Sequence, residues 1–96
     1  MSKFMKEFLL YEKRFTRVYI NQCHNKGRKT KLFAIRRDDI LGKGHFMGQI
    51  YFDGAWRQYV STFEPNTKWS AGCKEKICEF ERELNRNLRE KWKLKR

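Results

Sequence analysis

The C-terminal third of the chain shows the clearest hydrophobic pattern. Apolar side chains recur there at steps of three and four residues, which places them on one face of an α-helix. Ser70 precedes this stretch, and its hydroxyl can accept a hydrogen bond from the first helical turn. We therefore predict a helix of about 20 residues that begins after Ser70 and is frayed at residues 91–96. The predicted apolar stripe consists of Cys73, Ile77, Phe80, Leu84, Leu88 and Trp92.

The chain before this helix changes to a period of two, which is the period of β-strands. Alternating apolar and polar positions predict one strand that begins at Phe15 and another around Leu32 to Ile35. Residues 24–27, His-Asn-Lys-Gly, would join them as a turn, because asparagine and glycine tolerate positive φ. These two strands form the first predicted hairpin.

A second hairpin is predicted over residues 46–63. Asp53-Gly54 is a strong signal for a two-residue turn, and such a turn would place Tyr51 opposite Trp56. An aromatic cross-strand pair of this kind contributes about 0.2 to 1 kcal/mol.

The N-terminal residues show a helical spacing instead. Phe4, Met5, Phe8 and Leu9 would share one face of a short helix, which Ser2 could cap. We therefore predict a single α+β domain of 96 residues. It would contain a short N-terminal helix, a four-stranded antiparallel sheet made of two hairpins, and the long C-terminal helix packed on that sheet.

The charge balance is unusual for a chain of this size. Twenty-three Lys and Arg face 11 Asp and Glu, which gives a formal net charge of +12. Such a surplus attracts nucleic acid and other polyanions, although a protein can also be basic without using its charge in this way. No stretch approaches the roughly 20 apolar residues that span a bilayer, and the N-terminal apolar run is too short for a signal peptide. We expect the protein to stay in the cytoplasm.

The first predicted hairpin carries most of the unbalanced charge. Between Lys13 and Arg37 there are nine basic residues and no acid, with Tyr19 and Phe33 among them. Phosphates bind cations spaced along a surface, and exposed aromatic rings stack on bases. The alternative is that Lys and Arg protect edge strands from aggregation while the aromatic rings belong to the core. We predict a binding site for nucleic acid or a protein partner that consists of Arg17, Lys26, Arg28, Lys29, Lys31, Arg36 and Arg37.

The predicted C-terminal helix has a second, weaker basic face opposite its apolar stripe. Glutamates are interspersed along it, and Arg86 and Glu90 have the i, i+4 spacing of a helical ion pair. A solvated, charge-balanced face is the favoured interpretation. The residues of this possible secondary site are Arg82, Arg86, Arg89 and Lys93.

Neither the cysteines nor the acidic residues form a recognisable site. Cys73 and Cys78 lie five positions apart, so their side chains would point about 140° apart on a helix, which does not suit zinc. We expect no metal and no cofactor. Gly42-Lys43-Gly44 lacks the spacing and the Ser or Thr of a phosphate-binding loop.

We therefore predict that the protein is not an enzyme. The low-probability alternative is a metal-dependent nuclease, but no motif supports it. Its acids would come from Asp38, Asp39, Asp53 and Glu64.

One part of the chain resembles a group of small, uncharacterised bacteriophage and prophage proteins. The resemblance covers about residues 46–80 and rests on three segments. They are Gly48-Gln-Ile-Tyr-Phe-Asp-Gly-Ala-Trp-Arg-Gln-Tyr-Val, then Phe63-Glu-Pro-Asn-Thr, then Trp69-Ser-x-x-Cys73. It implies a phage accessory protein that acts in the cytoplasm of a bacterial host, and it assigns no functional residues. The Asp53-Gly54-Ala55 turn and the basic first hairpin depart from the group's pattern.

Four aromatic residues of this region have two interpretations. Trp56, Tyr59, Phe63 and Trp69 either lock the second hairpin onto the C-terminal helix or form a ligand-binding box, and the core role is favoured. We also expect Arg57 or Gln58 to point inward and hydrogen-bond the turn at residues 64–67.

These observations lead to a first functional hypothesis and two others. The first is a non-enzymatic accessory protein that binds DNA or RNA mainly through phosphate contacts. The alternative is a protein-binding inhibitor of a host or defence enzyme, of the anti-CRISPR type, which would recognise an acidic or nucleic-acid-binding protein. Binding of the N-terminal helix to a membrane surface is the third, and we expect that helix to pack on the core instead.

Overall fold

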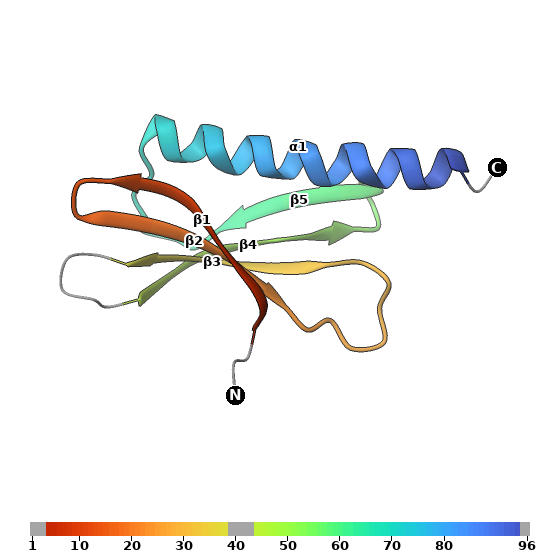
Figure 1. The fold of residues 1–96 in the computed structure, drawn as a ribbon, viewed down its shortest axis with the longest axis horizontal. Helices are drawn as coiled ribbons and strands as arrows, with labels where there is room; N and C mark the ends of the chain where they lie inside the picture. Colours follow the sequence, from red (N-terminus) through yellow and green to blue (C-terminus); the bar gives the residue numbers. More distant parts are fainter. Residues whose placement is uncertain (1–3, 39–43, 95–96) are drawn as a thin grey trace.

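Five antiparallel strands and one helix make up the described part of the chain. The structure, a computed structural model, describes residues 4–38 and 44–94. The strands form one sheet in the order β1-β2-β3-β4-β5, so each strand pairs with its neighbour in the chain. The helix lies along one face of this sheet (Figure 1). The elements are β1 (Phe4–Lys13), β2 (Thr16–Cys23), β3 (Leu32–Asp38), β4 (Gly44–Asp53), β5 (Gln58–Phe63) and α1 (Ala71–Leu94).

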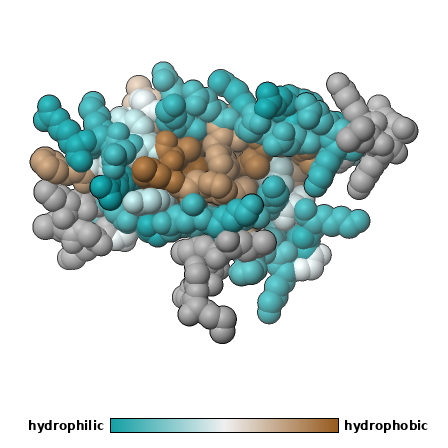
Figure 2. All heavy atoms as spheres, viewed as in Figure 1, coloured by the Kyte–Doolittle hydropathy of each residue, from teal (hydrophilic) through white to brown (hydrophobic). Residues whose placement is uncertain are grey.

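The core lies between α1 and the sheet, as the alternating pattern predicts. Ile20 pairs with Ile35, and Phe33 pairs with Ile50, so these buried side chains share the face toward the helix. The ring of Phe80 on α1 meets Phe33 edge-on, with the centroids 5.1 Å apart. Figure 2 shows hydrophobic side chains gathered between the helix and the sheet, with hydrophilic residues over the outer side of the helix.

The predicted apolar stripe of α1 is confirmed from Cys73 to Leu88, and so is its cap, whereas the Trp92 side chain lies outside the described part of the structure. Cys73 and Ile77 are buried, and the following stripe positions from Phe80 to Leu88 pack against the same core. Ser70 Oγ accepts a hydrogen bond from Cys73 N–H at 3.2 Å. The helix continues through Leu94, so residues 91–94, for which we expected fraying, belong to it.

The predicted N-terminal helix is wrong, because this segment forms β1. It pairs with β2 along its length, and the sheet therefore has five strands where we predicted four. Two irregularities in the register, between Phe4 and Lys6 and between Leu9 and Tyr11, each shift the alternation of side chains. These shifts hide the period of two in the sequence. A helix of this length is only marginally stable, whereas the ten-residue strand forms backbone hydrogen bonds with β2. Ser2, the expected cap, lies outside the described residues.

The predicted register of the second hairpin is also wrong. Asp53 pairs with Gln58, so four residues form the turn instead of two. The Asp53 carboxylate accepts hydrogen bonds from the backbone N–H groups of Ala55 at 2.8 Å and Trp56 at 3.1 Å. Arg57 closes the turn at a φ of +55°. The aspartate side chain thus stabilises a wider turn than the Asp-Gly pair alone predicts.

The four aromatic residues of this region do not share one role. Tyr59 is buried and Trp69 packs against the core, as expected. Phe63 lies against the Trp69 ring at 4.7 Å between centroids but is 46% exposed. Trp56 is 71% exposed in the turn, and Tyr51 pairs with Val60 in its place, so Trp56 is not a core residue.

Neither Arg57 nor Gln58 points inward, contrary to our expectation. Both are exposed, and the turn at residues 64–67 is closed by its own residues. Thr67 Oγ1 donates to the Glu64 carbonyl at 2.7 Å and accepts from the indole N–H of Trp69 at 2.8 Å. The aromatic ring therefore supplies the partner that we had assigned to Arg57 or Gln58.

The packing at Gly48 generates a first prediction. This residue lies where the β3–β4 register shifts, and a Cβ on it would approach the Thr62 carbonyl oxygen to 2.2 Å. Because that neighbour is backbone, Gly48→Ala should lower the free energy of unfolding by about 2 to 3 kcal/mol. Gly54→Ala is the control, since a Cβ there meets nothing within 4 Å. Urea denaturation followed by circular dichroism measures both, and equal stability of the two variants would contradict the prediction.

Candidate nucleic-acid interface

The connection between β2 and β3 presents the densest group of exposed cations among the predicted site residues. We call residues 24–31 the basic loop. Arg28 N–H donates to the Asn25 carbonyl at 3.1 Å, and Asn25 Nδ2 donates to the Thr30 carbonyl at 2.9 Å. Gly27 adopts a φ of +72°, so the predicted turn is confirmed within a longer connection. The exposed cations of the loop are Lys26, Arg28, Lys29 and Lys31.

The basic loop encloses a hollow that no carboxylate lines. The hollow measures about 350 Å³ and is bounded by residues from Gln22 to Lys31 alone. Its four cations therefore face a concave surface without a negative side chain to offset them, and their fields add there. Concave positive surfaces of this kind attract phosphate groups.

A second hollow joins the basic loop to an aromatic ring. It measures about 260 Å³, and Arg28 lines it together with Tyr51 and Leu32 of the neighbouring strands. Leu32 pairs with Tyr51 on the face of the sheet that is turned away from α1, which we call the outer face. A half-buried tyrosine beside an arginine can hold a nucleobase by stacking.

Buried hydrogen bonds hold the basic loop to the rest of the domain. The Tyr59 hydroxyl on β5 accepts a hydrogen bond from Lys31 N–H at 3.0 Å. Asn85, buried on α1, accepts from Tyr59 N–H at 2.6 Å through Oδ1 and donates to the Tyr59 carbonyl at 3.1 Å through Nδ2. The helix thus fixes Tyr59, and Tyr59 fixes one end of the loop.

One cation at this end of the molecule was absent from the predicted site. Lys91 and Lys31 line the same small hollow of about 100 Å³. We had expected fraying at position 91, and the sequence contains no signal that would place this side chain beside the loop.

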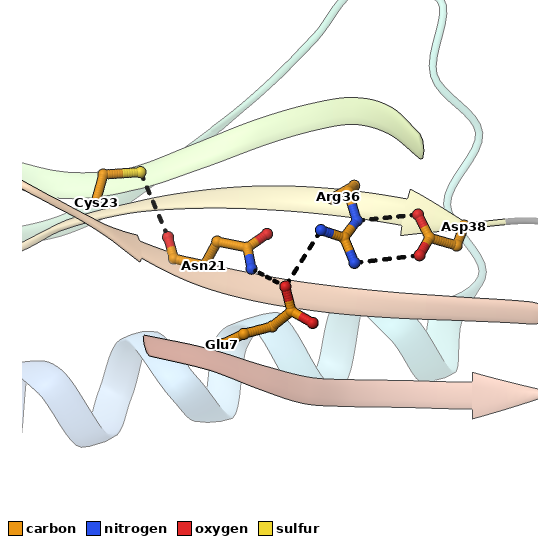
Figure 3. Close-up of polar contacts among 5 residues, drawn as sticks. All are labelled: Glu7, Asn21, Cys23, Arg36 and Asp38. Carbon is orange, nitrogen blue, oxygen red and sulfur yellow. Dashed lines mark hydrogen bonds and ion pairs between the residues drawn. The ribbon is translucent and has the colours of Figure 1, made fainter. Parts of the chain in front are cut away.

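Arg17 and Arg36 lie on the outer face, but acids from their own domain engage them. The Arg36 guanidinium binds both carboxylate oxygens of Asp38, at 2.9 and 3.1 Å, and lies 3.2 Å from Glu7 (Figure 3). It also lies over the Tyr19 ring at 4.7 Å. Arg17 pairs with Glu12 at 2.6 Å. Burial acts to lower the pKa of Arg36, and the two carboxylates more than offset it, so the net pKa shift is upward.

The ion pairs that Glu7 and Glu12 form depend on β1, which the sequence did not predict as a strand. Glu7 stands opposite Asn21 on β2 and accepts a hydrogen bond from its side-chain amide at 2.6 Å (Figure 3). Asn21 is only 1% exposed although it belongs to the outer face. The acid-free sequence run therefore receives its acids from a neighbouring strand, which reduces its net positive charge at the sheet.

Arg37 is separated from the other predicted residues. Consecutive strand residues point to opposite faces, so Arg37 lies on the side of the sheet toward α1 while Arg36 lies on the outer face. It pairs with Val18 and lines a different cavity, next to the first turn of the helix. The predicted site thus divides into three places, of which only the basic loop keeps its charges together.

The possible secondary face on α1 is interspersed with acids, as expected. Arg82, Arg86 and Arg89 are exposed. Arg86 pairs with Glu83 one turn earlier, and not with Glu90 as its spacing suggested. The Lys93 side chain lies outside the described part of the structure.

The acidic residues and cysteines are dispersed. Across residues 4–38 and 44–94, no three His, Cys, Asp or Glu side chains lie close enough together to hold a metal ion. Asp38 pairs with Arg36, Asp53 stabilises its turn, and Asp39 lies outside the described residues. All three cysteines carry free thiols. Burial raises the pKa of the Cys73 thiol above its ordinary value.

Comparisons with known proteins do not assign the chain to a class. No family model matches it, and neither curated proteins nor solved structures contain a significant match. The resemblance to phage proteins therefore stays a prediction. In the part of the chain that the structure describes, no helix is long and apolar enough to cross a membrane.

The link between Tyr59 and the loop generates a second prediction. Tyr59→Phe removes the acceptor of the Lys31 amide, so we expect a loss of about 1 kcal/mol in the free energy of unfolding and faster hydrogen exchange at that amide. Tyr51→Phe removes a hydroxyl on the outer face and serves as the control. If the Lys31 amide exchanges at the same rate in both variants, the tyrosine does not hold the loop.

The buried thiol generates a third prediction. Folded Cys73 keeps its proton to a higher pH than the unfolded chain does, because burial raises its pKa. Its contribution to stability is complete below the ordinary thiol pKa of about 8.5 and is lost as the pH rises through the folded pKa. The free energy of unfolding should therefore fall as the pH rises above about 8.5.

The Cys73→Ala variant isolates this contribution. It should show a shallower fall than the native protein, whereas Cys78→Ala, which changes an exposed thiol, should keep the native pH dependence. Urea titrations at a series of pH values provide the measurement. Identical slopes for the native protein and Cys73→Ala would show that this thiol is not responsible.

Proposed function

We propose that this protein binds DNA or RNA in the cytoplasm through its basic loop, mainly by contacts to phosphates. The observation that carries the proposal is the group of four exposed cations around a hollow that no carboxylate lines. When such a group binds a nucleic-acid backbone, condensed counterions are released, and their gain in entropy favours the complex. Contacts to phosphates carry no sequence information, so we expect little sequence specificity.

The surroundings of the loop support single-stranded nucleic acid as the better ligand. Arg28 and Tyr51 line one hollow, so a backbone phosphate and the base next to it could bind side by side. Stacking of this kind needs an unpaired base. Lys91 extends the positive surface from Lys31 onto the helix.

Arg17 and Arg36 have a different role in this proposal. Their carboxylate partners lie within the domain, and a phosphate would have to displace those partners. Arg36 meets Asp38 through two contacts, a strong geometry, so the exchange at Arg36 would bring little net affinity. The Arg17 and Glu12 side chains are 60% and 49% exposed, so their pair is weak, and a phosphate would gain only a similarly weak contact there. We therefore assign neither arginine to the nucleic-acid interface.

A protein partner is the alternative, because an acidic protein surface would meet the same four cations. An inhibitor of a host or defence enzyme would recognise its target in this way. The two functions differ in one measurable property. Only the first requires the purified protein to bind nucleic acid with an affinity that falls steeply with salt.

The test compares two charge-reversal variants with equal net charge. The first changes Lys26, Arg28 and Lys29 to Glu, and the second changes Arg82, Arg86 and Arg89 to Glu on α1. We expect the loop variant to bind labelled single-stranded DNA or RNA at least about tenfold more weakly at low salt. Its slope of log affinity against log salt should fall by about two to three. The helix variant should bind within about threefold of the native protein.

Fluorescence anisotropy across a salt series measures both values, and circular dichroism confirms that each variant is folded. Equal losses in the two variants would assign the binding to overall charge and not to the loop. Absence of binding by the native protein at low salt would exclude the nucleic-acid function and favour the protein partner.

A further inference from the structure

A second positively charged cavity lies at the opposite end of the sheet. It measures about 400 Å³ and lies between the β1–β2 turn, the end of β3 and the start of α1, on the left in Figure 1. We call it the cap cavity, because Ser70, which caps α1, lies on its wall. The basic loop does not contribute to it, so its ligand would be independent of the proposed interface.

Four cations and no carboxylate line the cap cavity. The cations come from three separate segments: Lys13 and Arg14 from the β1–β2 turn, Arg37 from β3, and Lys68 from the connection before α1. The first turn of the helix has no acidic residue that would offset them. Like charges placed around one space repel each other, and this cost is relieved when an anion binds among them.

The Arg37 side chain has one buried nitrogen without a hydrogen-bond partner among the described residues. This nitrogen is Nε, and it is shielded from solvent. Such a group destabilises the fold, more so when it is charged, unless a ligand or a water accepts its hydrogen bond. The guanidinium of Arg36, one position earlier, is paired with the carboxylates of Glu7 and Asp38. The two adjacent arginines differ in this way because they lie on opposite faces of the sheet.

The rest of the cavity wall is mostly apolar. Val18, Met47 and Cys73 are buried there. Trp69 adds an aromatic surface. Phe15 also lines the cavity and is 66% exposed, so its ring is accessible to a ligand.

We propose that the cap cavity binds a small organic anion with an aromatic body. The anionic group would meet Arg37 and the neighbouring lysines, and the ring would lie between Trp69 and Phe15. A mostly apolar cavity with a few convergent polar groups is the usual form of a small-molecule site, and its volume falls in the range of about 300 to 1,000 Å³.

The probe is 1-naphthyl phosphate, and the comparison ligands are neutral 1-naphthol and inorganic phosphate. Binding is followed by two-dimensional ¹H–¹⁵N NMR, with the indole N–H of Trp69 and the amide of Cys73 as reporters. The exposed indole of Trp56, in the β4–β5 turn, is the internal control. We expect saturable chemical-shift changes at the Trp69 and Cys73 signals and none at the Trp56 signal. Affinity should be at least about tenfold higher than for neutral 1-naphthol or for inorganic phosphate.

Three variants test the assignment of the anionic group. Arg37→Gln should weaken naphthyl phosphate binding at least about tenfold and leave 1-naphthol binding unchanged. Lys68→Gln changes an exposed residue, cannot unfold the core, and should weaken binding about threefold. Arg82→Gln, on the exposed side of α1, should have no effect.

Three results would overturn the proposal. One is equal affinity for the phosphate and the neutral naphthol, and another is native affinity in folded Arg37→Gln and Lys68→Gln. Shifts that appear at Trp56 as strongly as at Trp69 would also contradict it, because they indicate nonspecific association. None of these results bears on the basic loop, so the two binding proposals can fail separately.

Discussion

The hydrogen bonds between Asn85 and Tyr59 organise the domain. β5 lies at the edge of the sheet, and its Tyr59 peptide groups would lack partners there without the amide of Asn85. One buried side chain on α1 thereby fixes the helix along the sheet and covers the edge at that point. The Tyr59 hydroxyl then binds Lys31, so the position of the basic loop depends on the same pair.

The pairing of the strands determines how charge is distributed over the domain. Strand β1 brings Glu7 and Glu12 against the sheet, where they neutralise Arg36 and Arg17. The turns at the two ends of the sheet receive no such acids, and their cations surround separate hollows. Eight cations of the described residues are therefore gathered at two places, four around each hollow, with no carboxylate among them. The proposed nucleic-acid interface and the cap cavity occupy these two ends.

Local physical rules explain the parts of the fold that the sequence predicted correctly. The stripe of α1 has a period that only a helix can bury on one side, and Ser70 caps it through its own hydroxyl. The rules failed where strand pairing or a hydrogen bond from a side chain to the backbone set the local geometry. Bulges moved the period of β1, and the Asp53 carboxylate widened the β4–β5 turn. The cations of the basic loop could be named from composition, but Lys91 could not.

The sequence by itself determined the helix, the alternation of the central strands, and the presence of an acid-free basic run. Those features depend on neighbouring residues and on the total charge, which folding does not change. Only the tertiary structure decided which cations remain available to bind an anion. Ion pairs and faces depend on strand pairing, and pairing brought Glu7 to Arg36 and turned Arg37 toward the helix. An arginine's neighbours in space, and not its neighbours in sequence, determine whether a phosphate can bind to it.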